Sequence, residues 1–133
     1  MYKHILIPTD GSQVASDAIP RAIALAKVLG AKVTGITVTV PSEVFADATR
    51  ALADAEKYLG EVRDAASAAG LSCRVIRAEH EQPYQAIIEA AKKNGCDLIA
   101  MASHGRRGVS ALVLGSETVK VLTHCTVPVL VYR

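Results

Sequence analysis

Short apolar runs alternate with longer amphipathic segments along the whole chain, and this alternation limits the fold more than any other feature. Runs rich in branched residues predict strands at 4–8, 32–40, 71–78, 97–101 and 127–132. Helical periods between them predict helices at 12–29, 45–69, 83–94 and 116–124. No hairpin is predicted, so the strands should be parallel, with helices on both faces. Because such crossovers are right-handed, the expected fold class is α/β with a doubly wound open sheet.

The sequence predicts a possible interruption in the helix at 12–29 and the two ends of the helix at 45–69. Pro20 lies inside the first helical period and removes a backbone donor, which predicts a kink or a restart capped near Ser16. The second period predicts one long helix over 45–69, capped by Ser42 and ended by Gly70. Its inward-facing residues are expected to be Leu52, Ala55, Leu59, Val62 and Ala66.

Length and composition favour one domain over residues 1–133 and exclude several classes of partner. The formal net charge of +2 is too small to indicate nucleic acid or an anionic membrane. No apolar run approaches the roughly 20 residues that cross a bilayer. The N-terminus does not resemble a signal peptide, so a cytoplasmic location is expected. The three cysteines (Cys73, Cys96 and Cys125) lack metal-binding spacing and should be reduced.

The segment after the fourth predicted strand has the pattern of a phosphate-binding turn. Residues 102–105 (ASHG) are followed by nine residues and then by Gly115-Ser116, where the last helix begins. Glycines let a backbone approach a ligand closely, and the free amides of a helix start favour anions. The segment is therefore either a nucleotide phosphate site or a plain connection.

In an open parallel sheet, ligands bind beyond the carboxyl ends of the strands. The candidate loops are therefore 9–12, 38–42, 79–83 and 102–116. Asp10 could bind a ribose or a divalent metal, or it could accept amides from the next helix. Ser116 could likewise be an N-cap or a ligand contact. Arg106 and Arg107 could contact phosphate or be solvated, and His104 is not expected to be catalytic.

Four separated segments resemble the universal stress protein family. They are 5–12 (ILIPTDGS), 97–108 (DLIAMASHGRRG), 114–116 (LGS) and 127–131 (VPVLV). The likeness covers essentially the whole chain. It implies the strand order 3-2-1-4-5 of the adenine nucleotide alpha hydrolase-like fold, with the first and fourth strands side by side.

The resemblance is to the nucleotide-binding branch of the family, which carries Gly, two residues, Gly, nine residues and then Gly-Ser or Gly-Thr. Here Ala102 stands in place of the first glycine. Alanine is tolerable if its φ is negative, and harmful if φ is positive or if the methyl group enters the phosphate path. The implied cofactor-binding residues are Pro8, Thr9, Asp10, Val38, Met101, Ala102, Ser103, His104, Gly105, Arg106, Arg107, Gly108, Gly115, Ser116, Glu117 and Thr118.

By the same resemblance, Asp10 lies on the ribose or adenine side, Val38 contributes to the adenine pocket, and the phosphates lie on Gly105 and Gly115-Ser116. The implied ligand is ATP, with ADP and AMP as alternatives and Mg or Mn as an accompanying ion. The implied partner is a second copy of the chain, bound through the strand at 127–132. An apolar edge there would otherwise be exposed.

The leading hypothesis is a nucleotide-binding regulatory protein that acts as a sensor, with little or no catalysis. Slow ATP hydrolysis or autophosphorylation at Ser110 or Ser116 is a weaker alternative implied by the family. A ligand-free dimerisation module is another, and Ala102 favours it. A nucleotidyl transferase or ATP pyrophosphatase would need a different loop at 9–12, and a receiver domain would need an aspartate where Glu79 stands.

Overall fold

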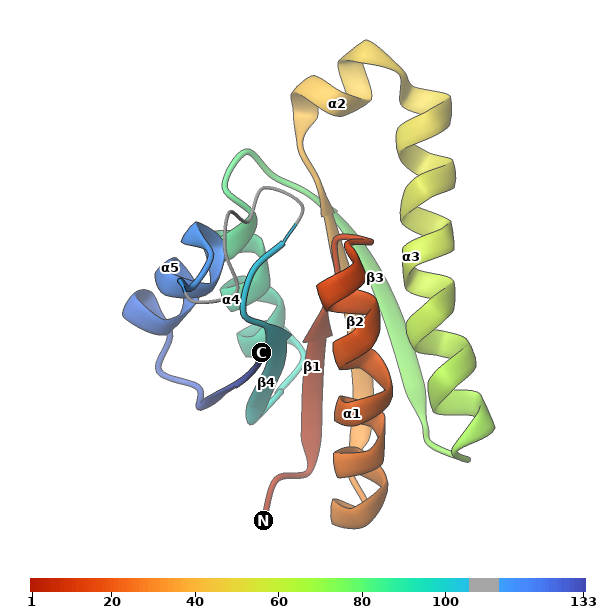
Figure 1. Cartoon of the computed structure of the whole chain (residues 1–133), viewed down its shortest axis with the longest axis vertical. Coiled ribbons are helices and arrows are strands. Elements are labelled where there is room, and N and C mark those ends of the chain that lie inside the picture. The colour runs from red at the N-terminus through yellow and green to blue at the C-terminus, as the bar shows by residue number, and fades with distance from the viewer. Residues whose placement is uncertain (106–112) are drawn as a thin grey trace.

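The computed structural model describes residues 1–105 and 113–133 (Figure 1). In these residues a single parallel sheet has the strand order β3-β2-β1-β4-β5. Its strands are β1 (His4–Pro8), β2 (Lys32–Thr39), β3 (Cys73–Glu79), β4 (Leu98–Ala102) and β5 (Val129–Tyr132). The predicted fold class and strand order are confirmed, and β1 lies in the centre with β2 and β4 on either side.

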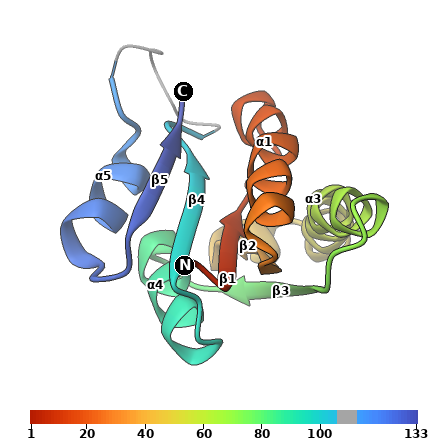
Figure 2. The ribbon, with the colours of Figure 1, turned by 90° about the horizontal axis from the view of Figure 1, so that it is seen from below.

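Helices cover both faces of the sheet, as Figure 2 shows. They are α1 (Gln13–Leu29) and α3 (Ala48–Ala68) on one face, and α4 (Pro83–Lys93) and α5 (Ser116–His124) on the other. Successive side chains of a strand point to opposite faces. Accordingly, Ile5 and Ile7 pack with α1 and α3, while Leu6 packs with α4 and α5. Burial on both faces explains the continuous apolar runs of the central strands.

The expected long helix over 45–69 is present as α3 (Ala48–Ala68), but its predicted start is wrong, because Phe45 and Ala46 belong to a separate short helix. A short helix, α2 (Pro41–Ala46), ends at Asp47, and α3 begins immediately after it. The Asp47 side chain accepts a hydrogen bond from the Arg50 amide at 3.1 Å, so Asp47 caps α3 in place of Ser42. Leu52, expected to face inward, is 45% exposed. The other four residues of that predicted stripe are buried.

The expected restart of the first helix near Ser16 is also wrong. Helix α1 continues through Pro20, and Ser12 caps it by accepting a hydrogen bond from the Ala15 amide at 3.2 Å. Pro20 lies on the exposed side of α1. Because water can reach this side, the carbonyl that Pro20 leaves without an amide partner is not orphaned in the core.

The three cysteines are free thiols, and burial raises the pKa of Cys96 to about 11, so that it stays protonated at neutral pH. Within the described residues, no helix combines the length and apolar character needed to cross a bilayer.

Candidate functional site

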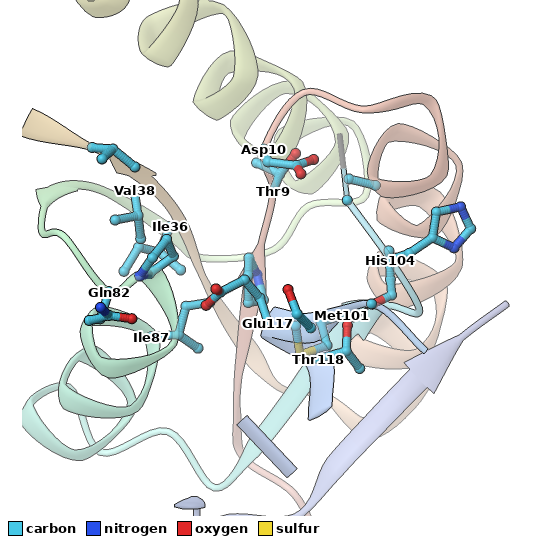
Figure 3. Close-up of a pocket in the computed structure, with 18 of the residues that line it drawn as sticks. Thr9, Asp10, Ile36, Val38, Gln82, Ile87, Met101, His104, Glu117 and Thr118 are labelled. Atoms are coloured by element: carbon cyan, nitrogen blue, oxygen red, sulfur yellow. Dashed lines mark hydrogen bonds between the residues drawn. The ribbon is translucent and has the colours of Figure 1, made fainter. Parts of the chain in front are cut away.

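A cavity of about 340 Å³ opens at the carboxyl ends of β1, β2 and β4 (Figure 3). It lies where the chain leaves the central strands of the sheet, as expected for an open parallel sheet. The predicted site residues that line it are Pro8, Thr9, Asp10, Val38, Met101, Ala102, His104, Gly105, Gly115, Ser116, Glu117 and Thr118. Ser103 does not line it, and Arg106, Arg107, Gly108 and Ser110 lie outside the described residues.

One half of the cavity is apolar. Ile36 and Val38 come from β2, Ile87 from α4 and Met101 from β4 (Figure 3). In the same view, Ile36, Val38 and Ile87 lie together on one side and His104 on the other, with Asp10 and Met101 between them. An apolar wall facing a few convergent polar groups is typical of a pocket for a small organic ligand.

Asp10 belongs to a tight turn that follows β1. Its Oδ1 accepts a hydrogen bond from the Ser12 amide at 3.0 Å, and Thr9 Oγ1 accepts one from the Gly11 amide at 3.3 Å. Gly11 has φ of +78°, and the ring of Tyr58 on α3 occupies the place of a Cβ, so the position needs glycine on both grounds. Of the two roles considered for Asp10, the turn role is therefore present in the structure.

The Asp10 carboxylate also lies against the glycine loop that follows β4. A Cβ on Gly105 would collide with Asp10 Oδ2, so glycine at 105 lets the carboxylate and the loop backbone approach closely. The two segments lie side by side because β1 and β4 are hydrogen-bonded neighbours, with Leu6 paired to Ile99. Asp10 thus faces the glycine loop, as expected if these strands are adjacent.

Gly115 packs directly on the backbone of residues 103 and 104. Its amide donates to the Ser103 carbonyl at 2.7 Å, and a Cβ on Gly115 would lie 2.9 Å from His104 Cα. Its φ is −65°, which any residue adopts, so the need for glycine is steric. Residues 103 and 104 and the start of α5 are therefore in direct contact, although ten residues separate them in the sequence.

Among the described residues, none is seen to cap the start of helix α5 with its side chain. Gly115 is the N-cap residue and makes no side-chain hydrogen bond, so the N-cap role considered for Ser116 is wrong. Ser116 is instead the first helical residue and lines the cavity. Backbone amides at a helix start without a side-chain acceptor favour an anion.

Ala102 satisfies the backbone condition for replacing a glycine. No described residue other than glycine has a positive φ, and Ala102 lies in β4, paired with Tyr132. It is 8% exposed and packs with Ala15 and Ala18 of α1. Its carbonyl accepts a hydrogen bond from Thr118 Oγ1 at 3.0 Å, which ties α5 to β4.

Ser103 supports the loop from behind the cavity wall. Its amide donates to the Tyr132 carbonyl at 2.7 Å, and its hydroxyl bonds His104 Nδ1 at 3.1 Å. The residue is 1% exposed. Ser103 therefore orients the His104 ring and the chain without reaching the cavity.

Glu117 joins the starts of the two helices that wall the cavity. Its Oε2 accepts a hydrogen bond from the Tyr84 amide at 2.8 Å, in the first turn of α4. The N-cap residue of α4, Gln82, makes no side-chain cap hydrogen bond, so Glu117 supplies this acceptor. Local sequence gives no signal for the contact, because the two residues are 33 positions apart.

The cavity also includes residues outside the predicted set. Four lining residues lie in the candidate loops 38–42 and 79–83 but were not named as site residues: Val40, Glu81, Gln82 and Pro83. Ala15, Ile36, Glu43 and Ile87 were missed altogether. Ile36 and Ile87 also pack in the core around Leu6, so their apolar character indicated burial alone.

The described residues contain no group of three or more His, Cys, Asp or Glu side chains placed to hold a metal ion. A divalent ion would therefore depend on ligand oxygens as well as on side chains such as Asp10.

Comparison with known proteins identifies the family: the chain belongs to the universal stress protein family, whose sequence model matches residues 1–133. Universal stress protein MJ0531 of Methanocaldococcus jannaschii is 32% identical over 142 residues, spanning 100% of this chain and 83% of the relative.

Two solved structures extend the likeness to three dimensions. The hypothetical protein MJ0577 superposes with a TM-score of 0.88 at 27% identity, over 98% of this chain and 95% of that one. A universal stress protein in complex with cAMP superposes with a TM-score of 0.75 at 26% identity, over 99% and 97%. The adenine nucleotide alpha hydrolase-like fold predicted for the chain is confirmed.

Proposed function

We propose that the protein binds an adenine nucleotide in this cavity and acts as a regulatory nucleotide sensor. The observation that carries the proposal is the pairing of an apolar half-pocket with an uncapped helix start across one cavity. A nucleotide base needs an apolar pocket, and a phosphate group is bound well by a helix start. The likeness to a universal stress protein in complex with cAMP supports the same ligand class.

The base, the ribose and the phosphates of the ligand would each contact a different part of the cavity. The base would lie against Ile36, Val38, Ile87 and Met101, and the ribose near Asp10. The phosphates would lie along Gly105, Gly115 and Ser116, because the two glycines have no side chain to keep a phosphate away and α5 begins at Ser116 without a side-chain cap from its N-cap residue. The proposed ligands are ATP, ADP or AMP, with Mg or Mn accompanying the phosphates of ATP.

Binding with little or no turnover is proposed because, among the described residues, the hydroxyl that is hydrogen-bonded to His104 does not reach the cavity. The Ser103–His104 pair has the hydrogen bond of such a dyad, but Ser103 is 1% exposed and lies outside the cavity wall. An alcohol nucleophile must reach its substrate, and this one does not. We therefore propose that the protein acts by binding the nucleotide and not by converting it.

We also propose a cytoplasmic homodimer that pairs through β5. This strand is at the edge of the sheet, and Leu130 on it is 36% exposed. Val119 and Leu122 of the adjacent α5 are exposed as well. An unpaired edge strand with apolar neighbours is a template for association, which a second copy would satisfy.

Isothermal titration calorimetry with AMP and ATP tests nucleotide binding. Val38→Trp fills the apolar half of the cavity and should weaken binding at least tenfold, an expectation based on steric exclusion. Val28→Trp is the matched control, because Val28 is 85% exposed on α1. If the native chain binds no adenine nucleotide, with or without Mg, the sensor proposal fails and a ligand-free dimerisation module replaces it.

A further inference from the structure

The wall of the cavity is acidic. Asp10, Glu43, Glu81 and Glu117 all line it, and none of the described lining residues is lysine or arginine. Asp10 and Glu43 each have a further interaction within the protein. Glu117 is the acidic residue closest in sequence to the uncapped start of α5, where a phosphate group would bind.

Within the part of the chain that the structure describes, the Glu117 carboxylate is held in place by a neutral hydrogen-bond donor and only a weak ion pair. Its Oε2 accepts from the Tyr84 amide, a neutral partner, at 2.8 Å. Among the described residues, Glu117 forms an ion pair with the Lys120 ammonium, 3.7 Å from Oε1, and both side chains are about two-fifths exposed (38% for Glu117 and 42% for Lys120). Exposed pairs of this kind are weak and screened. Glu117 therefore keeps most of its negative field at the cavity.

This field opposes the attraction of the helix start for anions. The amides at a helix N-terminus act as roughly half a positive charge, which is less than the full negative charge of a carboxylate. One phosphate group can gain direct hydrogen bonds from the amides of α5. Each further phosphate adds negative charge near Glu117 without a second helix start to receive it, since Glu117 already occupies the start of α4.

We propose that Glu117 is a specificity-determining residue that makes this pocket favour adenosine ligands with a single phosphate, open or cyclic, over ATP. The inference rests on the proposed function and adds a ranking among its ligands. Through its bond to Tyr84, Glu117 also fixes α4 beside α5. The charge effect is separable from this structural role, because glutamine keeps an acceptor for the Tyr84 amide.

The test is calorimetry of adenosine, AMP and ATP in EDTA, which leaves the phosphate charge bare. The native chain should bind AMP more tightly than ATP. Glu117→Gln should shift the ratio of the two dissociation constants toward ATP by about tenfold, from Coulomb's law at intermediate dielectric, and change adenosine binding by less than about twofold. Glu89→Gln, an exposed site on α4, removes the same charge outside the cavity and should leave the ratio unchanged.

Salt provides a second measurement that needs no variant. Raising ionic strength screens the carboxylate, so the preference of the native chain for AMP should narrow. Equal or tighter binding of ATP by the native chain, or an unchanged ratio in Glu117→Gln, would overturn the inference while nucleotide binding stands. Failure of all three ligands to bind would overturn the proposed function together with it.

Discussion

Gly115→Ala tests whether the contact between the helix start and the glycine loop determines the shape of the site. The new Cβ would lie 2.9 Å from His104 Cα and 3.1 Å from His104 Cβ. Carbon atoms pack best at about 3.5–4.0 Å, so the overlap is at least about half an ångström. The first contact is backbone, which cannot rotate away. The chain around His104 must therefore move.

Overpacking of this kind costs about 1–3 kcal/mol. Urea denaturation should show an unfolding free energy lower by this amount, with no contribution from φ, which is −65° at Gly115. Because the amide of Gly115 bonds the Ser103 carbonyl, the displacement also reaches the loop at 103–105. Calorimetry should then show nucleotide affinity at least about tenfold weaker, which corresponds to about 1.4 kcal/mol.

Gly60→Ala is the matched control for this prediction. Gly60 lies within α3, and a Cβ there would meet Arg63 Nη2 only at an ordinary 3.5 Å. Alanine is the better helix former, so this variant should gain about 0.5–1 kcal/mol and bind nucleotide as the native chain does. If Gly115→Ala matched Gly60→Ala in both stability and affinity, the argument from close approach would be refuted.

Three further predictions concern parts of the fold away from the loop. Asp47→Ala should lower the unfolding free energy by about 1 kcal/mol in urea, whereas Ser42→Ala should not, because Asp47 caps α3; the opposite ranking would contradict the break between α2 and α3. Burial and the nearby Lys32 charge lower the pKa of His4 from 6.5, so the unfolded chain binds that proton first and stability should fall as pH drops through 6.5. Thermal midpoints at about pH 7.5 and pH 5.5 should show the fall, and His4→Gln should reduce it. Leu130→Glu should convert a dimer to a monomer in sedimentation, and a native chain that is already monomeric would refute pairing through β5.

The elements could be predicted from the sequence because each has a local cause. Helix α5 begins and ends where predicted, since Gly115 precedes it and an apolar run follows. The strand order could not be derived from spacing, because any right-handed arrangement of these strands satisfies the same periodicity. It was expected only from the resemblance to a family. The break at Asp47 was missed because Pro41, Ser42 and Asp47 are all good residues for a helix start.

Prediction of the candidate site was most complete where the chain leaves β1 and β4. Turn chemistry near Asp10 and glycines near His104 are visible in the sequence, whereas contributions from α4 are not. Ile87 looks like any core residue of an amphipathic helix. The bond from Glu117 to the Tyr84 amide joins segments whose proximity depends on the packing of α4 against α5. Such contacts are tertiary and leave no local pattern.

The peptide groups around Ser103 link the outer edge of the sheet to the ligand cavity. On one side, the Ser103 amide bonds Tyr132 in the edge strand β5; on the other, the Ser103 carbonyl bonds the amide that starts α5. Both bonds are 2.7 Å long and one residue carries them. A displacement of β5 would therefore act on the cavity wall through two hydrogen bonds of one residue. The same residue that holds the edge strand thus also holds the helix start at the cavity.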